Sequence, residues 1–214
     1  MSCSQTRSRQ RTLRCAVALL GLSMLSGCLI DATLDANGAG TVTIKYRLTT
    51  AAQLESSKKR MQSASVKLVS ANVQPDKWAT YELKFDDITK LNTIDFFSKA
   101  KFALTGDKDV KTLSIKYANP DASEMPADMI NYFGREVSFT LHCPGPVVDS
   151  NGTSVEGNTV TWKYTTKEFS TIQEKEYHVT YKLAPGAANA GAAGSESPAS
   201  AAATPVASTP AAAK

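Results

Sequence analysis

The sequence has few of the residues and motifs that carry chemistry. Its 214 residues include four cysteines and two histidines, which are too few for a disulfide scaffold or a histidine-rich metal site. The motifs Gly-x-Ser-x-Gly and His-Glu-x-x-His and a phosphate-binding glycine-rich loop are all missing. His142 and His178 are expected on the polar faces of strands. These absences predict a protein that is not an enzyme and needs no cofactor or metal.

Most of the chain has no excess of positive or negative residues. The formal net charge of +4 comes from 24 Lys and Arg against 20 Asp and Glu. Residues 1–27 contain Arg7, Arg9, Arg11 and Arg14 and no acid, so basic and acidic residues are equal in number over the rest. A chain without a broad positive surface is not expected to bind nucleic acid.

The N-terminal segment has the three parts of a lipoprotein signal peptide. A basic stretch is followed by an apolar stretch over residues 15–25 and then by Leu25-Ser26-Gly27-Cys28. Eleven residues are too few to span a bilayer as a helix, which needs ~20. The last four residues resemble the bacterial lipobox, which is cleaved between Gly27 and Cys28. We therefore expect residues 1–27 to be removed and the Cys28 thiol to carry a diacylglyceryl group with fatty acids such as palmitate.

Such an anchor predicts a place in the bacterial cell envelope, attached to the membrane by lipid. Leu29 rather than Asp follows the anchor, which favours the outer membrane in a Gram-negative source. In other bacteria, the outer face of the cytoplasmic membrane is expected. Only Leu29 and Ile30 separate Cys28 from the first expected strand at Asp31, so the domain should lie within ~10 Å of the membrane surface.

The C-terminal segment, residues 184–214, is low in complexity. It contains 14 Ala and 4 Pro and has no aromatic residue. Such a composition cannot bury enough apolar surface to offset the loss of conformational entropy on folding. We expect a signal peptide over 1–27, a single domain over 28–183 and a disordered tail over 184–214.

Deleting residues 184–214 is expected to leave the melting temperature within ~1 °C of that of the complete chain, because the tail offers nothing to bury. Differential scanning calorimetry on both chains measures the change. A decrease of several degrees would show that the tail packs on the domain.

Alternating apolar and polar residues predict strands between these ends. Residues 41–48 alternate strictly and follow the turn-forming Asn37–Gly40, so segments 31–35 and 41–49 are expected to form a hairpin. Similar alternation occurs at 81–85, 113–117, 137–143, 160–164 and 177–183. It places Cys143 on a buried strand face, where a reactive thiol is not expected. One apolar face per strand is typical of an antiparallel sheet that is covered on one side.

Three short helices are expected to pack on this sheet. The first spans residues 50–62, the second begins at Asn92, and the third has Pro126 in its first turn and ends at Gly134. Each is too short to be stable alone. The predicted fold class is α+β, a twisted antiparallel sheet or partial barrel of about seven to eight strands, with two or three short helices packed on one face.

The most informative pattern lies between residues 137 and 183. A strand runs into Pro144-Gly145-Pro146-Val147, then come Asn151-Gly152 and a strand that begins Gly157-Asn158-Thr159-Val160-Thr161-Trp162. Asn-Gly favours a hairpin turn, and we expect a β-meander here. The pattern resembles the end of the domain found in LppM-type bacterial lipoproteins.

This resemblance covers residues 28 to about 183. It implies an envelope lipoprotein with a mixed α/β domain that is similar to lipid-binding folds, and it implies no catalytic residues. The family's C-terminal transmembrane helix is not expected here, since the Ala- and Pro-rich tail takes its place.

The second and third helices are expected to lie over aromatic residues of the sheet, including Tyr117 and Tyr164. The candidate lining of an apolar ligand pocket is Phe96, Phe97, Met125, Met129, Phe133 and Trp162. Methionine and aromatic residues line adaptable pockets, but they also fill ordinary cores. A pocket predicts the binding of lipids, glycolipids or other hydrophobic envelope molecules. A solid core predicts a structural or assembly lipoprotein whose protein partners the sequence does not reveal.

Overall fold

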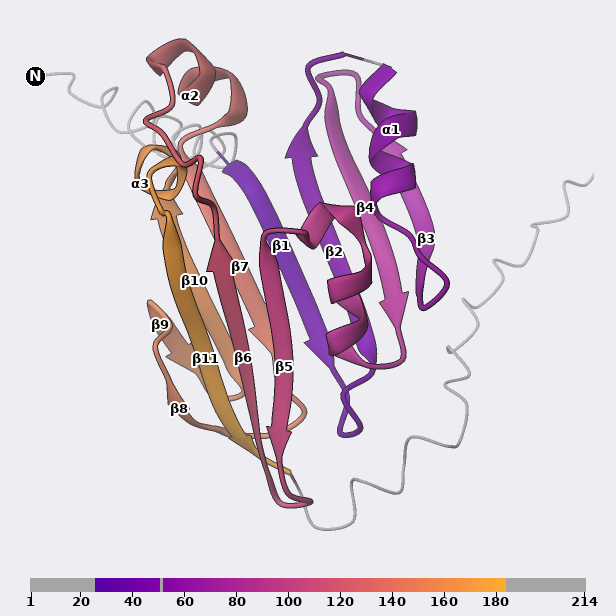
Figure 1. Ribbon diagram of the computed structural model, residues 1–214, viewed down its shortest axis with the longest axis vertical. Coiled ribbons are helices and arrows are strands. Elements are labelled where there is room, and N and C mark those ends of the chain that lie inside the picture. The colour runs from indigo at the N-terminus through magenta and orange to yellow at the C-terminus, as the bar shows by residue number, and fades with distance from the viewer. Residues whose placement is uncertain (1–25, 51, 184–214) are drawn as a thin grey trace, which may run out of the picture.

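A computed structural model describes residues 26–50 and 52–183, which form an α+β domain (Figure 1). The predicted tail and nearly all of the predicted signal peptide lie outside the described residues. Eleven strands form two open sheets of seven and four strands, accompanied by three α-helices and two 3-10 helices. The predicted α+β class is confirmed, but the strands are more numerous than expected and are divided between two sheets.

The larger sheet is mixed. In order across the sheet, its strands are β3 (Val66–Val73), β4 (Trp78–Phe85), β2 (Gly40–Arg47), β1 (Ser26–Leu34), β7 (Glu136–His142), β10 (Thr159–Thr165) and β9 (Ser154–Glu156). β1 and β2 form the predicted antiparallel hairpin. β1 and β7 run parallel, with Ile30 beside Phe139. Alternation along a strand reveals its apolar face but not the direction of its neighbour, so this pair could not be predicted.

The smaller sheet covers part of one face of the larger one. Its strands, in order, are β5 (Ala100–Gly106), β6 (Val110–Ala118), β11 (Glu174–Lys182) and β8 (Val147–Ser150). Trp162 of β10 meets Tyr177 of β11 edge to face, with ring centroids 5.7 Å apart. Two sheets that each have one apolar face bury these faces against each other, which explains the layered core.

Short helices cover the part of the larger sheet that the smaller sheet leaves free (Figure 1). These are α1 (Ala52–Arg60), η1 (Ile88–Thr93) and η2 (Asp95–Phe97). The second predicted helix is therefore two 3-10 turns, and Asp87 rather than Asn92 caps the first of them by accepting a hydrogen bond from the Thr89 amide at 2.7 Å. The Asn92 side chain instead exchanges two hydrogen bonds with the backbone of Phe102, at 2.8 and 2.9 Å.

Two more helices lie at the end of the sheets where β1 and β7 begin (Figure 1). α2 (Ala127–Phe133) stops before Gly134, whose φ of 96° favours glycine, as predicted, whereas Pro126 is the N-cap of the helix and not part of its first turn. α3 (Thr166–Ser170) was not predicted. Its start is nevertheless encoded, since the side chains of Thr165 and Glu168 form a reciprocal capping box.

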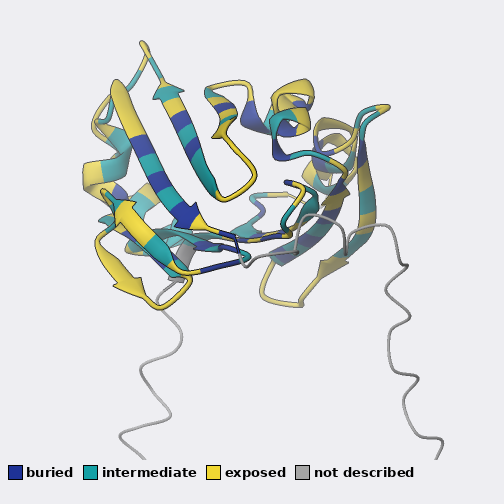
Figure 2. Cartoon of the chain, turned by 90° about the horizontal axis from the view of Figure 1, so that it is seen from below, coloured by how far each residue is buried: buried dark blue, intermediate teal, exposed yellow. Residues whose placement is uncertain are grey.

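The core lies between the layers. Figure 2 shows buried residues alternating with exposed ones along the strands, as the sequence pattern predicts. The largest buried side chains include Trp162, Tyr81 and Tyr181. Cys143 also lies in this core, and burial raises the pKa of its thiol to about 12. The burial of Cys143 agrees with the prediction.

The predicted meander does not form. The chain runs from β8 in the smaller sheet to β9 in the larger one, so Asn151-Gly152 is a crossover between sheets and not a hairpin turn. The tight turn before β10 lies instead at Gly157, which has a φ of 63°. A turn motif alone does not determine which sheet the next strand joins.

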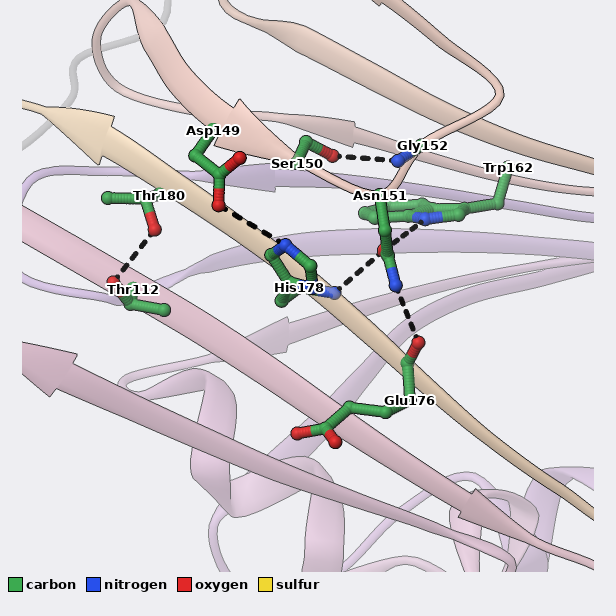
Figure 3. Close-up of polar contacts among 9 residues, drawn as sticks. All are labelled: Thr112, Asp149, Ser150, Asn151, Gly152, Trp162, Glu176, His178 and Thr180. Atoms are coloured by element: carbon green, nitrogen blue, oxygen red, sulfur yellow. Dashed lines mark hydrogen bonds and ion pairs between the residues drawn. The ribbon is translucent and has the colours of Figure 1, made fainter.

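Asn151 ties the two sheets together (Figure 3). Its Oδ1 accepts hydrogen bonds from the Trp162 indole Nε1 and from the His178 amide, each at 3.0 Å. Its Nδ2 donates to the Glu176 carbonyl at 2.7 Å. One side chain therefore links β10 of the larger sheet to β11 of the smaller sheet.

Replacing Asn151 with alanine is expected to lower the free energy of unfolding by about 2 kcal/mol, because the buried Trp162 indole loses its hydrogen-bond acceptor. Urea denaturation followed by tryptophan fluorescence measures this loss. The matched control is Asn72→Ala on the exposed surface of β3, where a change within about 0.5 kcal/mol is expected. Equal losses in both variants would refute the assigned role of Asn151.

Candidate functional site

An apolar cavity of about 270 Å³ lies between the two sheets, near α3 and the start of β1. This volume is close to the lower limit for small-molecule pockets, which is ~300 Å³. The apolar residues that line it are Cys28, Ile30, Phe96, Phe97, Ala100, Phe102, Ile115, Tyr117, Val137, Phe139, Tyr164, Phe169 and Tyr177. They come from strands of both sheets and from η2 and α3.

The walls of the cavity follow from strand periodicity. Residues two apart share a strand face, so β1 contributes Cys28 and Ile30, and β5 contributes Ala100 and Phe102. β6 and β7 each contribute such a pair as well, whereas β10 and β11 contribute one residue each. Each apolar face continues to the end of its sheet, where the side chains of the two layers leave a space between them.

Aromatic rings form two sides of the cavity. On one side Phe97 lies edge to face with both Phe96 and Phe102, at centroid distances of 5.0 and 5.2 Å. On the other, Phe169 of α3 lies 5.5 Å from Tyr117 and 6.1 Å from Tyr164. These rings support one another around the space, so it does not depend on a single side chain.

The charged part of the lining is basic. Arg60 of α1 and Lys99 before β5 are the only charged residues among those that line the cavity, and both are exposed. The Lys99 ammonium donates a hydrogen bond to the Asn119 side chain. Exposed cations beside an apolar space can hold a negatively charged group at the mouth while an apolar group lies within.

Cys28 lies within β1 and not on a linker outside the domain. Its neighbour Leu29 is in register with Lys45 of β2 and with Ser138 of β7. The expected spacer of Leu29 and Ile30 is therefore part of the sheet, which is a correction to the sequence-based expectation. Cys28 is half-buried, in keeping with its place on the cavity wall.

The residues predicted to form a pocket are divided by the structure. Phe96 and Phe97 line the cavity. Met125, Met129 and Phe133 do not, because they lie just before or within α2, which is beyond the end of the sheets against α3, β1 and β2. Met129 is 38% exposed, whereas Trp162 is 1% exposed and belongs to the core, stacked on Phe139 at 5.1 Å.

Several lining residues were missed. Val137, Phe139 and Tyr177 lie on alternating strands, which would identify them as inward-facing but not as part of a cavity. Phe169 could have been found from the capping-box spacing of Thr165 and Glu168. No sequence signal places Cys28 at the cavity.

The described residues hold few other groups that could bind a metal or act in catalysis. His142 lies 3.4 Å from a carboxylate oxygen of Asp31, and His178 lies 3.2 Å from one of Asp149. Residues 26–50 and 52–183 contain no group of three or more side chains that could hold a metal ion. In the same part of the chain, no helix is long and apolar enough to cross a membrane.

Comparison with known proteins finds a related family. Residues 30–176 match the family model of the LppM domain. The solved structures include a similar one, the folded domain of the Mycobacterium tuberculosis LppM protein determined by NMR. It has a TM-score of 0.45 and 14% sequence identity, over 74% of this chain and 91% of that chain. No curated protein matches the sequence.

Proposed function

Because this chain belongs to the LppM domain family, we propose that it is a non-enzymatic lipoprotein whose domain binds a lipid or another hydrophobic envelope molecule. The observation that carries the proposal is the apolar cavity between the two sheets. We further propose that the protein is held at the membrane by lipid on Cys28, with the cavity facing the lipid headgroups.

The lining of the cavity favours an amphiphile as the ligand. Burial of an apolar chain contributes ~0.8 kcal/mol per methylene group, so six buried methylenes contribute about 5 kcal/mol. Arg60 and Lys99 would hold an anionic or strongly polar headgroup at the mouth. A lipid with its acyl chain inward and its headgroup outward satisfies both parts of the cavity.

A second candidate function is contact with other envelope proteins. Val69 and Val73 of the edge strand β3 are 52% and 43% exposed. An edge strand with exposed apolar side chains can pair with a strand of another protein. This candidate predicts that a partner binds along β3 and that the cavity has no occupant.

Filling the cavity tests the proposed function. Ala100 lines the cavity, whereas Ala103 on the same strand faces solvent. Ala100→Phe is expected to lower the amount of bound lipid at least ~10-fold, a change of about 1.4 kcal/mol, because the ring occupies the ligand's space. Native mass spectrometry of the complete protein, purified from bacterial membranes, measures the co-purified lipid.

Ala103→Phe is the matched control and should leave the bound lipid unchanged. A fluorescent apolar probe, displaced by added fatty acid, gives a second measurement on the same proteins. Unmodified protein that carries no lipid and binds no probe would contradict lipid binding and favour the second candidate.

A further inference from the structure

Cys28, the predicted site of lipidation, is also part of the wall of the candidate ligand cavity. Cys28 supplies part of the cavity wall, and Ile30, two residues further along the same strand face, supplies the next part. Pairing of β1 with β2 on one side and with β7 on the other holds this strand in place. Any group carried on the Cys28 sulfur must therefore begin beside the cavity.

We propose that one acyl chain of the anchor on Cys28 lies in this cavity, so that the protein's own anchor competes there with free lipid. This inference rests on the proposed function and on the predicted lipidation of Cys28. The occupant is an acyl chain that is covalently part of the mature protein. The cavity's apolar walls, including Phe97, Phe139 and Phe169, suit such a chain.

The covalent attachment gives the anchor an advantage over free lipid. A chain tethered beside its binding site has an effective concentration in the millimolar range for short flexible links. A free lipid displaces it only by binding more tightly, for example through a headgroup at Arg60 and Lys99. The cavity therefore selects lipids whose headgroups interact with these two cations.

Occupation of the cavity also changes membrane attachment. A diacylglyceryl group has two chains, and a single chain in the bilayer gives only marginal, reversible binding. With one chain in the cavity, one chain remains in the membrane. A free lipid that displaces the first chain returns it to the bilayer and strengthens attachment, since coupling between two binding events is reciprocal.

Photo-cross-linking tests the inference directly. Cells are grown with a diazirine-bearing fatty acid that enters both the anchor and the membrane lipids, and the complete lipoprotein is irradiated in vesicles of these lipids at a high lipid-to-protein ratio. We expect mass spectrometry of the digested protein to find the Cys28 lipopeptide joined to peptides from β6, β7 or β11 that line the cavity. Ala100→Phe should lower this yield at least ~5-fold, and Ala103→Phe should not change it.

A second measurement follows transfer of the lipoprotein between vesicles. Ala100→Phe drives the chain into the bilayer, so its transfer should be at least ~10-fold slower than that of the unmodified protein and of Ala103→Phe. Ala100→Leu replaces Ala100→Phe if the larger residue prevents folding.

The outcomes separate this inference from the proposed function. Anchor cross-links to cavity peptides support the inference, whether or not free lipid is also attached there. Cavity peptides modified only by free lipid would overturn it and leave the proposed function standing. Cavity peptides without any lipid adduct would overturn both.

Discussion

Gly145→Ala is expected to lower the free energy of unfolding by about 3 kcal/mol or more, because a β-carbon at this position would clash with backbone. The new atom would lie 1.8 Å from the carbonyl oxygen of Lys182. Neither segment can easily move, since the Lys182 amide also donates a hydrogen bond to the Pro146 carbonyl at 3.0 Å. Urea denaturation of the unmodified and substituted proteins measures the loss.

The matched control for this change is Gly157→Ala. Nothing lies within 4 Å of the β-carbon that it would add, although the φ of 63° disfavours alanine. The expected loss is therefore only about 1 kcal/mol. If Gly145→Ala proves no more destabilising than this control, the close approach of the two backbones is not what requires glycine.

This prediction gives the family-like Pro-Gly-Pro pattern a structural explanation. Residues 144–146 leave β7 and pass directly against the end of β11 before β8 begins. Glycine permits the close approach, and the prolines on either side limit the conformations of the unfolded chain. We therefore expect changes in this motif to affect stability more than ligand binding.

Cys28→Ala is expected to remove nearly all of the protein from the membrane fraction or to leave residues 1–27 uncleaved. The reason is that Cys28 is the only residue predicted to carry the lipid anchor. Two acyl chains hold a protein stably at a membrane, whereas a protein with none depends on weak surface contacts. Fractionation of cells, followed by immunoblotting for both amount and apparent mass, measures the result. The apparent mass distinguishes a cleaved protein from one that keeps residues 1–27.

Cys143→Ala serves as the control, since Cys143 is buried in the core. It should remain with the membranes, although it removes a small buried side chain. A Cys28→Ala protein that is cleaved and still pellets with membranes would show that the lipobox prediction is wrong. Lipid analysis of the mature N-terminus would then have to identify another anchor.

Local patterns predicted the parts of the fold that depend on neighbouring residues. The β1–β2 hairpin follows from two alternating segments around Asn37–Gly40, and α2 follows from Pro126 and Gly134. The burial of Cys143 follows from its place in an alternating run. In each case the relevant energies come from residues within a few positions of one another.

Local patterns could not predict which of the two sheets each strand joins. Asn151-Gly152 has the composition of a hairpin turn, yet the chain there crosses from one sheet to the other. The crossover is stabilised by hydrogen bonds that the Asn151 side chain accepts from Trp162 of β10 and His178 of β11, which are 11 and 27 residues away in sequence. A local turn preference is weak compared with these contacts and with the burial of two facing sheets.

The candidate site shows the same division. Phe96 and Phe97 were predicted from their residue type, and both line the cavity. Met129 and Phe133 have equally suitable side chains but lie on α2 beyond the sheets, and Met125 lies just before this helix. Composition selects residue types that can line a pocket, whereas their position depends on how each element is packed.

The sequence by itself determined which segments form most of the strands, which face of each strand is apolar, and which residue is the predicted point of attachment to the membrane. These properties follow from periodicity and from short motifs, which act along the chain. Only the tertiary structure decided that two sheets face each other, that β1 runs parallel to β7, and that Cys28 lies at an apolar cavity. A cavity is the space that side chains from distant strands leave unfilled, so its existence depends on their joint packing and on no single stretch of sequence.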